Sequence, residues 1–349
     1  MQISEKAKER FCKDCNIPIR VYKEPFFSEK IKLYDKVYNT VEKWNRFVHE
    51  LDKYKDEQSY FEDYNAIKDA AINSIHNSEA FQLFNAEDMN KYAIRNKMLP
   101  GKDIFKPTND GKIFISIDMR KANFSSLSHY DKRIFNGSAS WEEFLKQFTN
   151  NEHIIHSKYI RQVILGNCNP KRHITYEKYI MDQVLTMLDH EFDLKNHIVF
   201  FSNDEIVYDM TFLKNPEYLK TAQKAIELLL NKNFDIPFRV ELFTLHKIYG
   251  TDGYCKEIYN KNGQTTFDLK GLDSFTVPFV LRYLAGEDIT ENDKVFIYEG
   301  KLSKFIEVPE VKLDISQTNK DFSAYIDQNI DVNATNEEMD PFDADELDR

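Results

Sequence analysis

The first 111 residues carry apolar side chains at the three- and four-residue spacing of helices. The spacing is clearest over 34–54, where one helix face is predicted from Tyr34, Val37, Tyr38, Val41, Trp44, Phe47, Val48 and Leu51. A further helix is predicted at 60–75, and the sequence Leu99-Pro100-Gly101 marks a loop after it. We therefore expect a helical region over residues 1–111.

From Lys112 onward, short runs rich in β-branched and aromatic residues alternate with helical segments. Strands are predicted at 112–118, 197–202, 205–210 and 238–245. The two-residue turn Asn203-Asp204 joins the middle two strands as a hairpin. Helices are predicted from Ser140 with Glu143 completing a capping box, over 175–192, and from Pro216 to about 234 with Asn215 as the cap.

This order reads β, α, β, β, α, β, with roughly fifty residues inserted after the first strand. It predicts an α+β fold with a four-stranded antiparallel sheet and helices on one face, the ferredoxin-like arrangement. A β-hairpin is also predicted over 254–267, centred on Asn262-Gly263.

Carboxylates stand at two matching places in this topology. Asp118 ends the first strand, and Asp204-Glu205 sits at the tip of the hairpin. Strands one and three are neighbours in such a sheet, so these side chains are expected to converge. Crowded carboxylates repel each other, and a hard cation such as Mg²⁺ relieves that repulsion.

A pair of such ions can activate an attacking hydroxyl group and stabilise a leaving pyrophosphate oxygen. We therefore predict Asp118, Asp204 and Glu205 as catalytic residues, with Asp118 and Asp204 as ligands of Mg²⁺ or Mn²⁺. The alternative is a surface hairpin that carries Asn203-Asp204 for conformational reasons alone.

Two segments resemble the motifs of a known enzyme family. The segment 118–129 resembles motif A of family A DNA polymerases, and 201–207 resembles their motif C, with Asn203 in place of a histidine. The segment 246–250 is similar to a Lys-x-Tyr element of family B polymerases, and 269–272 is similar to their later Lys-Gly pair.

The resemblance spans about residues 112–272 and implies a polymerase-like organisation. It implies a palm over 112–248 with reduced fingers inserted at about 120–172, then a thumb-like or β-hairpin module over 249–306. Lys247, Tyr249 and Lys270 are then expected to contact nucleic acid, and Asn123 to lie against the ribose. Asn123 leaves the choice between dNTP and rNTP open, and the motif matches favour DNA.

A nucleotidyl-transfer site also needs cations for the triphosphate. Within 158–172 we predict Arg161, Lys171 and Arg172 for this role, because the arginine fork binds phosphate oxygens two at a time. The alternative is a solvated basic surface. No exonuclease-like array of acidic motifs precedes the sheet, so no proofreading is expected.

The formal net charge of −11 is placed unevenly. Thirteen acidic and three basic residues lie in 307–349, so residues 1–306 are close to neutral. We expect 307–349 to be a disordered, solubilising tail, with docking of a protein partner as the alternative.

Other features argue against a secreted or membrane protein. No apolar run approaches the roughly 18 residues that span a bilayer. We therefore expect a cytoplasmic protein that has no membrane partner. Four cysteines in 349 residues make no disulfide framework, and Cys12-x-x-Cys15 is only half of a zinc site.

The sequence thus predicts a small template-directed DNA polymerase without proofreading. Its substrates would be a primer-template and nucleoside triphosphates. Two alternatives remain: an inactive, palm-like accessory protein that binds nucleic acid, and a nucleotide cyclase on the same sheet. The cyclase is disfavoured by Ser202-Asn203, which stands where such enzymes use paired glycines.

Overall fold

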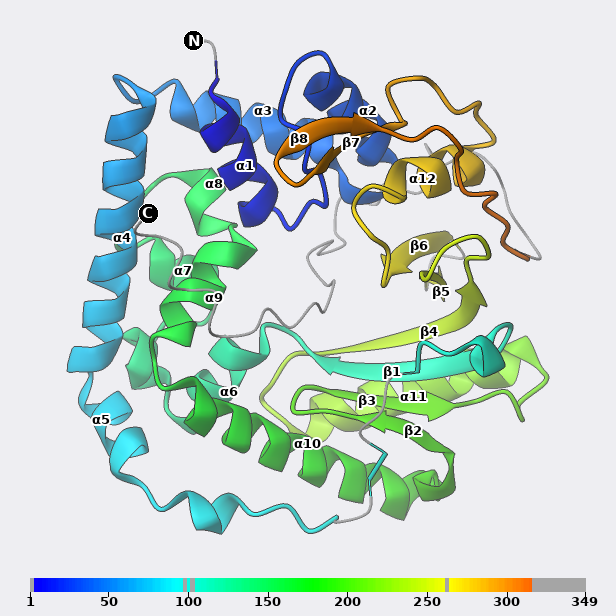
Figure 1. Cartoon of the computed structure of the whole chain (residues 1–349). Coiled ribbons are helices and arrows are strands. Elements are labelled where there is room, and N and C mark those ends of the chain that lie inside the picture. Colours follow the sequence, from blue (N-terminus) through cyan, green and yellow to red (C-terminus); the bar gives the residue numbers. More distant parts are fainter. Residues whose placement is uncertain (1–2, 97–98, 101–103, 261–263, 316–349) are drawn as a thin grey trace.

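A computed structural model of the chain describes residues 3–96, 99–100, 104–260 and 264–315. This part of the chain is a mixed α and β structure with twelve α-helices and a six-stranded antiparallel sheet. Its elements follow one another around a ring (Figure 1): the N-terminal helices lie at the top, α4 runs down one side, α10 lies along the bottom, and the sheet closes the other side.

The N-terminal region is helical, as expected. Its helices are α1 (Glu5–Asp14), α2 (Phe26–Tyr38), α3 (Thr40–Leu51), α4 (Glu57–Asn77) and α5 (Glu79–Ala86). The prediction of one helix through 34–54 is wrong, because Asn39 takes a left-handed conformation with φ of 49° and separates α2 from α3. Asparagine tolerates that conformation better than most residues, and the Asp35 carboxylate accepts a hydrogen bond from the Val41 amide across the break (2.8 Å).

The main sheet has the strand order β2-β3-β1-β4-β5-β6, and each neighbouring pair is antiparallel. The strands are β1 (Ile113–Met119), β2 (Ile198–Phe201), β3 (Glu205–Asp209), β4 (Phe238–Lys247), β5 (Tyr254–Tyr259) and β6 (Thr265–Lys270). The four expected strands are all present, and β1 lies between β3 and β4. The expected strand number is too small, because the 254–267 hairpin pairs with β4 and extends the same sheet. The centre of that hairpin, Asn262-Gly263, lies outside the described residues.

The later helices follow their expected signals closely. They are α6 (Ala122–Tyr130), α7 (Trp141–Leu145), α8 (Glu152–Ile155), α9 (Lys158–Gly166), α10 (Pro170–Phe192), α11 (Pro216–Asn233) and α12 (Val277–Ala285). The Ser140 hydroxyl accepts a hydrogen bond from the Glu143 amide (3.1 Å), as a capping residue does. Asn215 caps α11 in the same way. Helix α10 begins five residues earlier than predicted, because Pro170 occupies its first position.

Shorter elements complete the described structure. Single 3₁₀ turns lie at Met89–Tyr92, Pro107–Asn109, Lys132–Phe135 and Lys195–His197. A separate two-stranded sheet is formed by β7 (Val295–Tyr298) and β8 (Lys301–Lys304). Of the acidic tail predicted at 307–349, residues 316–349 lie outside the described part.

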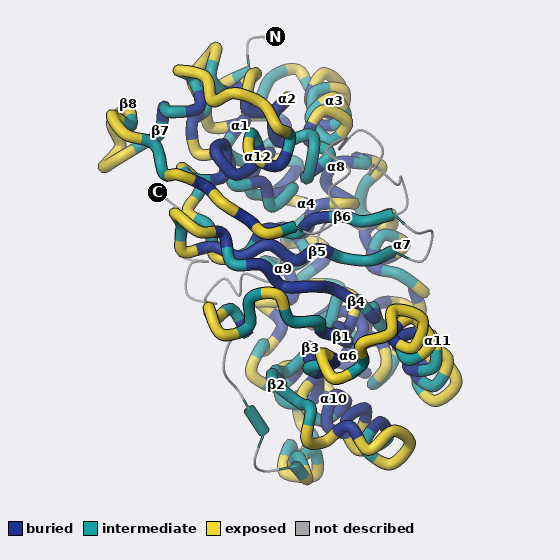
Figure 2. Tube along the Cα trace, turned by 90° about the vertical axis from the view of Figure 1, so that its right-hand side faces the viewer, coloured by how far each residue is buried: buried dark blue, intermediate teal, exposed yellow. Residues whose placement is uncertain are grey.

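The two faces of the main sheet differ in character. On one face, Ile117, Ile206 and Leu242 are buried in the large core beneath the helices that cover the sheet. On the opposite face the alternate residues of each strand form a smaller apolar cluster, which includes Phe114, Val207 and Phe243. The charged residues at the strand ends belong to this second face. Figure 2 shows the central strands as largely buried.

One buried carboxylate joins the N-terminal helices to the segment inserted after β1. Asp14 at the end of α1 is 0% exposed. It accepts hydrogen bonds from Tyr64 of α4 (2.8 Å) and Ser157 before α9 (3.0 Å), and it contacts His153 of α8 (3.0 Å). Helix α9 is therefore held in place by contacts with α1 and α4.

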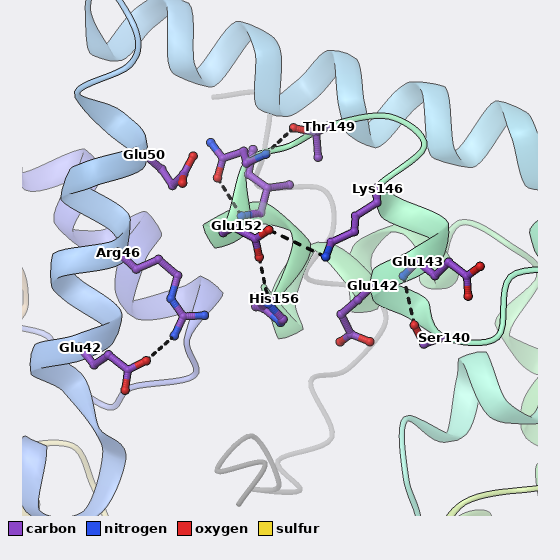
Figure 3. A network of polar contacts seen from close by, with 12 residues as sticks. Glu42, Arg46, Glu50, Ser140, Glu142, Glu143, Lys146, Thr149, Glu152 and His156 are labelled. Atoms are coloured by element: carbon purple, nitrogen blue, oxygen red, sulfur yellow. Dashed lines mark hydrogen bonds and ion pairs between the residues drawn. The ribbon is translucent and has the colours of Figure 1, made fainter. Parts of the chain in front are cut away.

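Nearby surface ion pairs are more exposed. Figure 3 shows Arg46 beside Glu42 on α3, and Glu152 of α8 between Lys146 and His156. Exposed pairs of this kind contribute about 0–1 kcal/mol each, so the buried Asp14 network is the stronger link. Among the described helices, none combines the length and apolar character needed to cross a membrane.

Candidate active site

The ends of three neighbouring strands bring the predicted carboxylates together. Asp118 on β1 lies directly opposite Glu205 on β3 and Arg239 on β4. The Met119 amide also donates a hydrogen bond to the Asp204 carbonyl oxygen (2.8 Å). Residues directly opposite in an antiparallel sheet point to the same face with Cβ atoms about 5 Å apart. Asp118 and Asp204, which are 86 positions apart in the sequence, therefore lie at one end of the sheet.

Asp118 is buried and held by an arginine. Arg239 donates from Nη2 to Asp118 Oδ2 (3.1 Å), and its Nε lies 3.4 Å from Glu241 Oε1. Burial raises the pKa of Asp118 to about 6, the Arg239 charge opposes that rise, and Glu205 adds to it. On β5, the Lys256 ammonium lies 3.8 Å from Glu205 Oε1, which brings a residue three strands away to the same site.

Asp204 is the more strongly perturbed carboxylate. Its pKa is raised to about 8, mainly by burial and then by the neighbouring charges of Asp118 and Glu177, while a hydrogen bond from Ser202 (2.9 Å) acts in the opposite direction. The charge of Asp118 thus disfavours the ionised form of Asp204, whereas Arg239 and Lys256 favour the ionised form of Asp118. Such clustering of perturbed carboxylates is typical of functional sites.

This pair fits a divalent cation that is shared with a substrate. Among the described residues, no three His, Cys, Asp or Glu side chains gather closely enough to hold a metal ion by themselves. Mg²⁺ is commonly held by one or two carboxylates together with water and substrate phosphates. Asp118 and Asp204 supply such a partial set of hard oxygen ligands, and Arg239 contacts only Oδ2 of Asp118.

Sequence reasoning did not identify Glu177 as part of the site. This α10 residue is 2% exposed and accepts a hydrogen bond from Asn203 Nδ2 (2.7 Å). Its other oxygen contacts His173 (3.2 Å) and Ser126 of α6 (3.4 Å). Asn203 therefore fixes the hairpin tip to α10 and α6. The available signal was a glutamate that shares the inward face of the helix with apolar residues such as Ile180 and Val184.

A group of cations lies beside the carboxylates. Lys158 at the start of α9 is 9% exposed. Its pKa is lowered to about 8 by burial, then by the charges of Arg161 and Lys270, while Asp118 opposes the shift. The predicted residues Arg161 and Lys270 are thus close enough to influence Lys158. Sequence reasoning missed Lys158, although its position three residues before Arg161 places both on one helix face.

The other two predicted triphosphate ligands lie at the start of α10. Arg172 donates from Nη2 to the carbonyl oxygens of Phe84 (2.8 Å) and Glu87, and its guanidinium lies over the Phe84 ring. These contacts fasten the end of α5. Lys171 is exposed on the same helix turn. Asn123 lies in the first turn of α6, close in sequence to Asp118.

Lys247 and Tyr249 lie at the opposite end of β4 from Arg239. Eight residues of strand separate Lys247 from Arg239, which corresponds to about 26 Å. The Lys247 ammonium donates to the carbonyl oxygens of Thr251 (2.8 Å) and Gly253 (3.3 Å). The Tyr249 hydroxyl, on a half-exposed side chain, donates to Asp110 (2.7 Å). Both residues therefore have local structural partners far from the carboxylates.

Comparison with known proteins adds no relative: no family model matches the chain, and no curated protein matches its sequence. The functional argument therefore rests on the geometry of the site.

The contacts of Arg172 indicate a structural role, which can be distinguished by experiment from a role in binding the triphosphate. Replacing Arg172 by methionine is expected to lower the free energy of unfolding by about 1–3 kcal/mol, because the part-buried carbonyl groups of Phe84 and Glu87 lose the hydrogen bonds that Arg172 donates. Urea denaturation measures this change. A selective rise in the KM for nucleotide with unchanged stability would instead assign Arg172 to the triphosphate.

Proposed function

We propose that the chain is a metal-dependent nucleotidyltransferase that adds nucleotides to the 3′ hydroxyl of a primer under template direction. The observation that carries this proposal is the pair formed by Asp118 on β1 and Asp204 in the turn before β3, whose pKa values are raised to about 6 and about 8. Buried carboxylates that repel each other are suited to sharing a divalent cation with a triphosphate.

The sheet supports a palm-type interpretation. The partial order β2-β3-β1-β4, with helices α10 and α11 in the two crossover connections, is that of a ferredoxin-like βαββαβ unit. In our proposal this unit is the palm, and β5 and β6 extend it. Helices α6–α9 form the reduced fingers, because they lie in the segment inserted after β1.

Under this proposal, Asp118 and Asp204 would hold Mg²⁺ or Mn²⁺. When bound, such an ion polarises the phosphoryl oxygens and makes an attacking hydroxyl more acidic. Arg239 keeps Asp118 in place, and Lys256 does the same for Glu205. Lys158 and Arg161 bind the oxygens of the triphosphate. Glu177 positions the hairpin tip through Asn203.

Lys158 provides a test of the triphosphate site. Replacing Lys158 by methionine removes a cation beside Asp118 and is expected to lower kcat/KM for nucleotide by about 10²-fold. Lys178→Met is the matched control, because Lys178 is exposed on α10. Steady-state incorporation with both variants measures the effect. Equal rates for the two variants would remove Lys158 from the site.

Primer extension tests the proposed function. A labelled primer-template is incubated with dNTPs or rNTPs in separate reactions, with Mg²⁺ or Mn²⁺, and GTP alone is supplied in a further reaction. Template-dependent growth of the primer supports the proposal and identifies the sugar. A cyclic nucleotide product from GTP without primer growth would identify a cyclase. Primer-template binding without any product would identify an accessory protein.

A further inference from the structure

A cavity of about 310 Å³ lies between the N-terminal helices and the β7 strand. Its walls come from α2, from the loop that joins α1 to α2, and from residues 274–275 and 295–297. Figure 1 shows α2 and β7 together at the top of the molecule, whereas β1 and β3 lie in the lower half. The volume is at the small end of the range for pockets that hold small molecules.

A buried lysine lines this cavity. Lys30 of α2 is 95% buried, since only 5% of its surface is exposed. Among the described residues, its ammonium has neither a hydrogen bond nor an ion pair. The charges of two carboxylates, Asp293 and Glu29, act on it, and Asp293 is already bound by Arg282 (2.9 Å). A buried ammonium group is costly unless it meets an anion.

A second cation and several aromatic rings line the same cavity. Arg20 lies at its edge and is exposed, and Glu9 is the carboxylate in the wall. The rings are those of Tyr22, Tyr34, Phe275 and Phe296. Phe275 leaves 36% of its surface exposed and lies 5.6 Å from Phe296 between ring centres. Cationic groups bind phosphate, and aromatic rings stack on nucleobases.

We propose that this cavity binds a nucleoside phosphate, with the phosphate on Lys30 and Arg20 and the base against Phe275 and Phe296. The ligand is either a free mononucleotide or the 5′-phosphorylated end of a nucleic acid strand, since both present the same chemical group. The site shares no residue with the carboxylate site on the main sheet and does not depend on the proposed polymerase activity.

Titration calorimetry on the full chain tests the proposal. Adenosine 5′-monophosphate is titrated in EDTA, so that no divalent cation supports binding at Asp118 and Asp204. Lys30→Met is expected to weaken binding at least tenfold, because a charge-assisted contact is lost. Lys32→Met is the matched control, because Lys32 is exposed on the same helix. Lys30→Arg is expected to restore part of the affinity.

Two oligonucleotides identify the source of the ligand. Tighter binding of a 5′-phosphorylated strand than of its 5′-hydroxyl counterpart, lost in Lys30→Met, assigns the site to a strand end. Tighter binding of the mononucleotide assigns it to free nucleotide. If Lys30→Met does not fold, Arg20→Gln and Phe275→Ala serve instead, because both side chains are exposed.

Three results would overturn the proposal. The first is the absence of binding to the unmodified protein up to about 1 mM ligand, a free energy of only about −4 kcal/mol. The second is equal affinity in Lys30→Met and Lys32→Met. The third is inorganic phosphate binding as tightly as the nucleotide, because the aromatic wall would then have no role.

Discussion

Replacing Asp204 by asparagine is expected to abolish nucleotide incorporation and to stabilise the fold at the same time. Incorporation falls by at least about 10³-fold, because a charged group that acts on the reacting phosphate is lost. Stability rises because the folded protein holds Asp204 in a site that disfavours its ionised form. A residue with a purely structural role would show the opposite effect on stability.

The sign of the stability change follows from proton linkage. The pKa of Asp204 is about 8 in the folded protein against an ordinary value of 3.8. The folded chain therefore binds this proton more tightly than the unfolded chain, and the free energy of unfolding falls as pH rises from about 4 to about 8. Asparagine needs no proton, so at pH 7 the substitution is expected to raise the free energy of unfolding by on the order of 2–4 kcal/mol.

Thermal unfolding between pH 5 and pH 8 measures this effect. The Tm of Asp204→Asn is expected to exceed that of the unmodified protein at pH 7 and to approach it at pH 5. Asp209→Asn is the matched control at the other end of β3. Thr211 and Lys112 lower the pKa of Asp209 against the effect of burial, so that its substitution removes a stabilising charge. A lower Tm for Asp204→Asn would contradict the claim that the folded protein disfavours the ionised form of Asp204.

Replacing Asp14 by alanine is expected to cause the largest loss of stability, about 3–5 kcal/mol. The substitution removes a fully buried carboxylate and leaves the Tyr64 and Ser157 hydroxyls without their acceptor. It also leaves His153 without its partner. Because Ser157 caps α9, the substitution is also expected to displace Lys158 and reduce incorporation in the fraction that remains folded.

Urea denaturation with Asp69→Ala as control measures the loss. Asp69 is exposed on α4, where its carboxylate lies 3.6 Å from the ammonium group of the adjacent Lys68. Its substitution is expected to change the free energy of unfolding by less than about 0.5 kcal/mol. Similar small changes for both variants would show that Asp14 does not join α1, α4 and the α8–α9 segment.

The strands of the first four-stranded unit could be predicted because their signals are local. The run that ends at Asp118, the turn at Asn203-Asp204 and the Pro216 helix start each depend on a few adjacent residues. The break at Asn39 could not be predicted from periodicity, since apolar spacing continues through it. The pairing of β5 with β4 was also missed, because a hairpin signal does not say which strand the hairpin joins.

The site was predictable only in part for a similar reason. Asp118 and Asp204 follow from strand order, because residues at matched strand ends must meet. The places of Arg239 and Lys256 depend on the register of β4 and on the pairing of β5 with β4, which local sequence signals do not determine. Arg172 is a cation in the segment predicted to bind the triphosphate, but its guanidinium donates hydrogen bonds to carbonyl groups at the end of α5. Charge pattern alone does not distinguish such roles.

The most direct measurement of the central claim is incorporation of a single nucleotide opposite each of the four template bases, with and without Mg²⁺. The unmodified protein is expected to add the complementary nucleotide in each case, only with the metal ion present. Asp118→Asn is expected to bind the primer-template and add none. Failure of the unmodified protein to add a nucleotide opposite any base, while it binds the primer-template, would contradict the proposed nucleotidyl transfer.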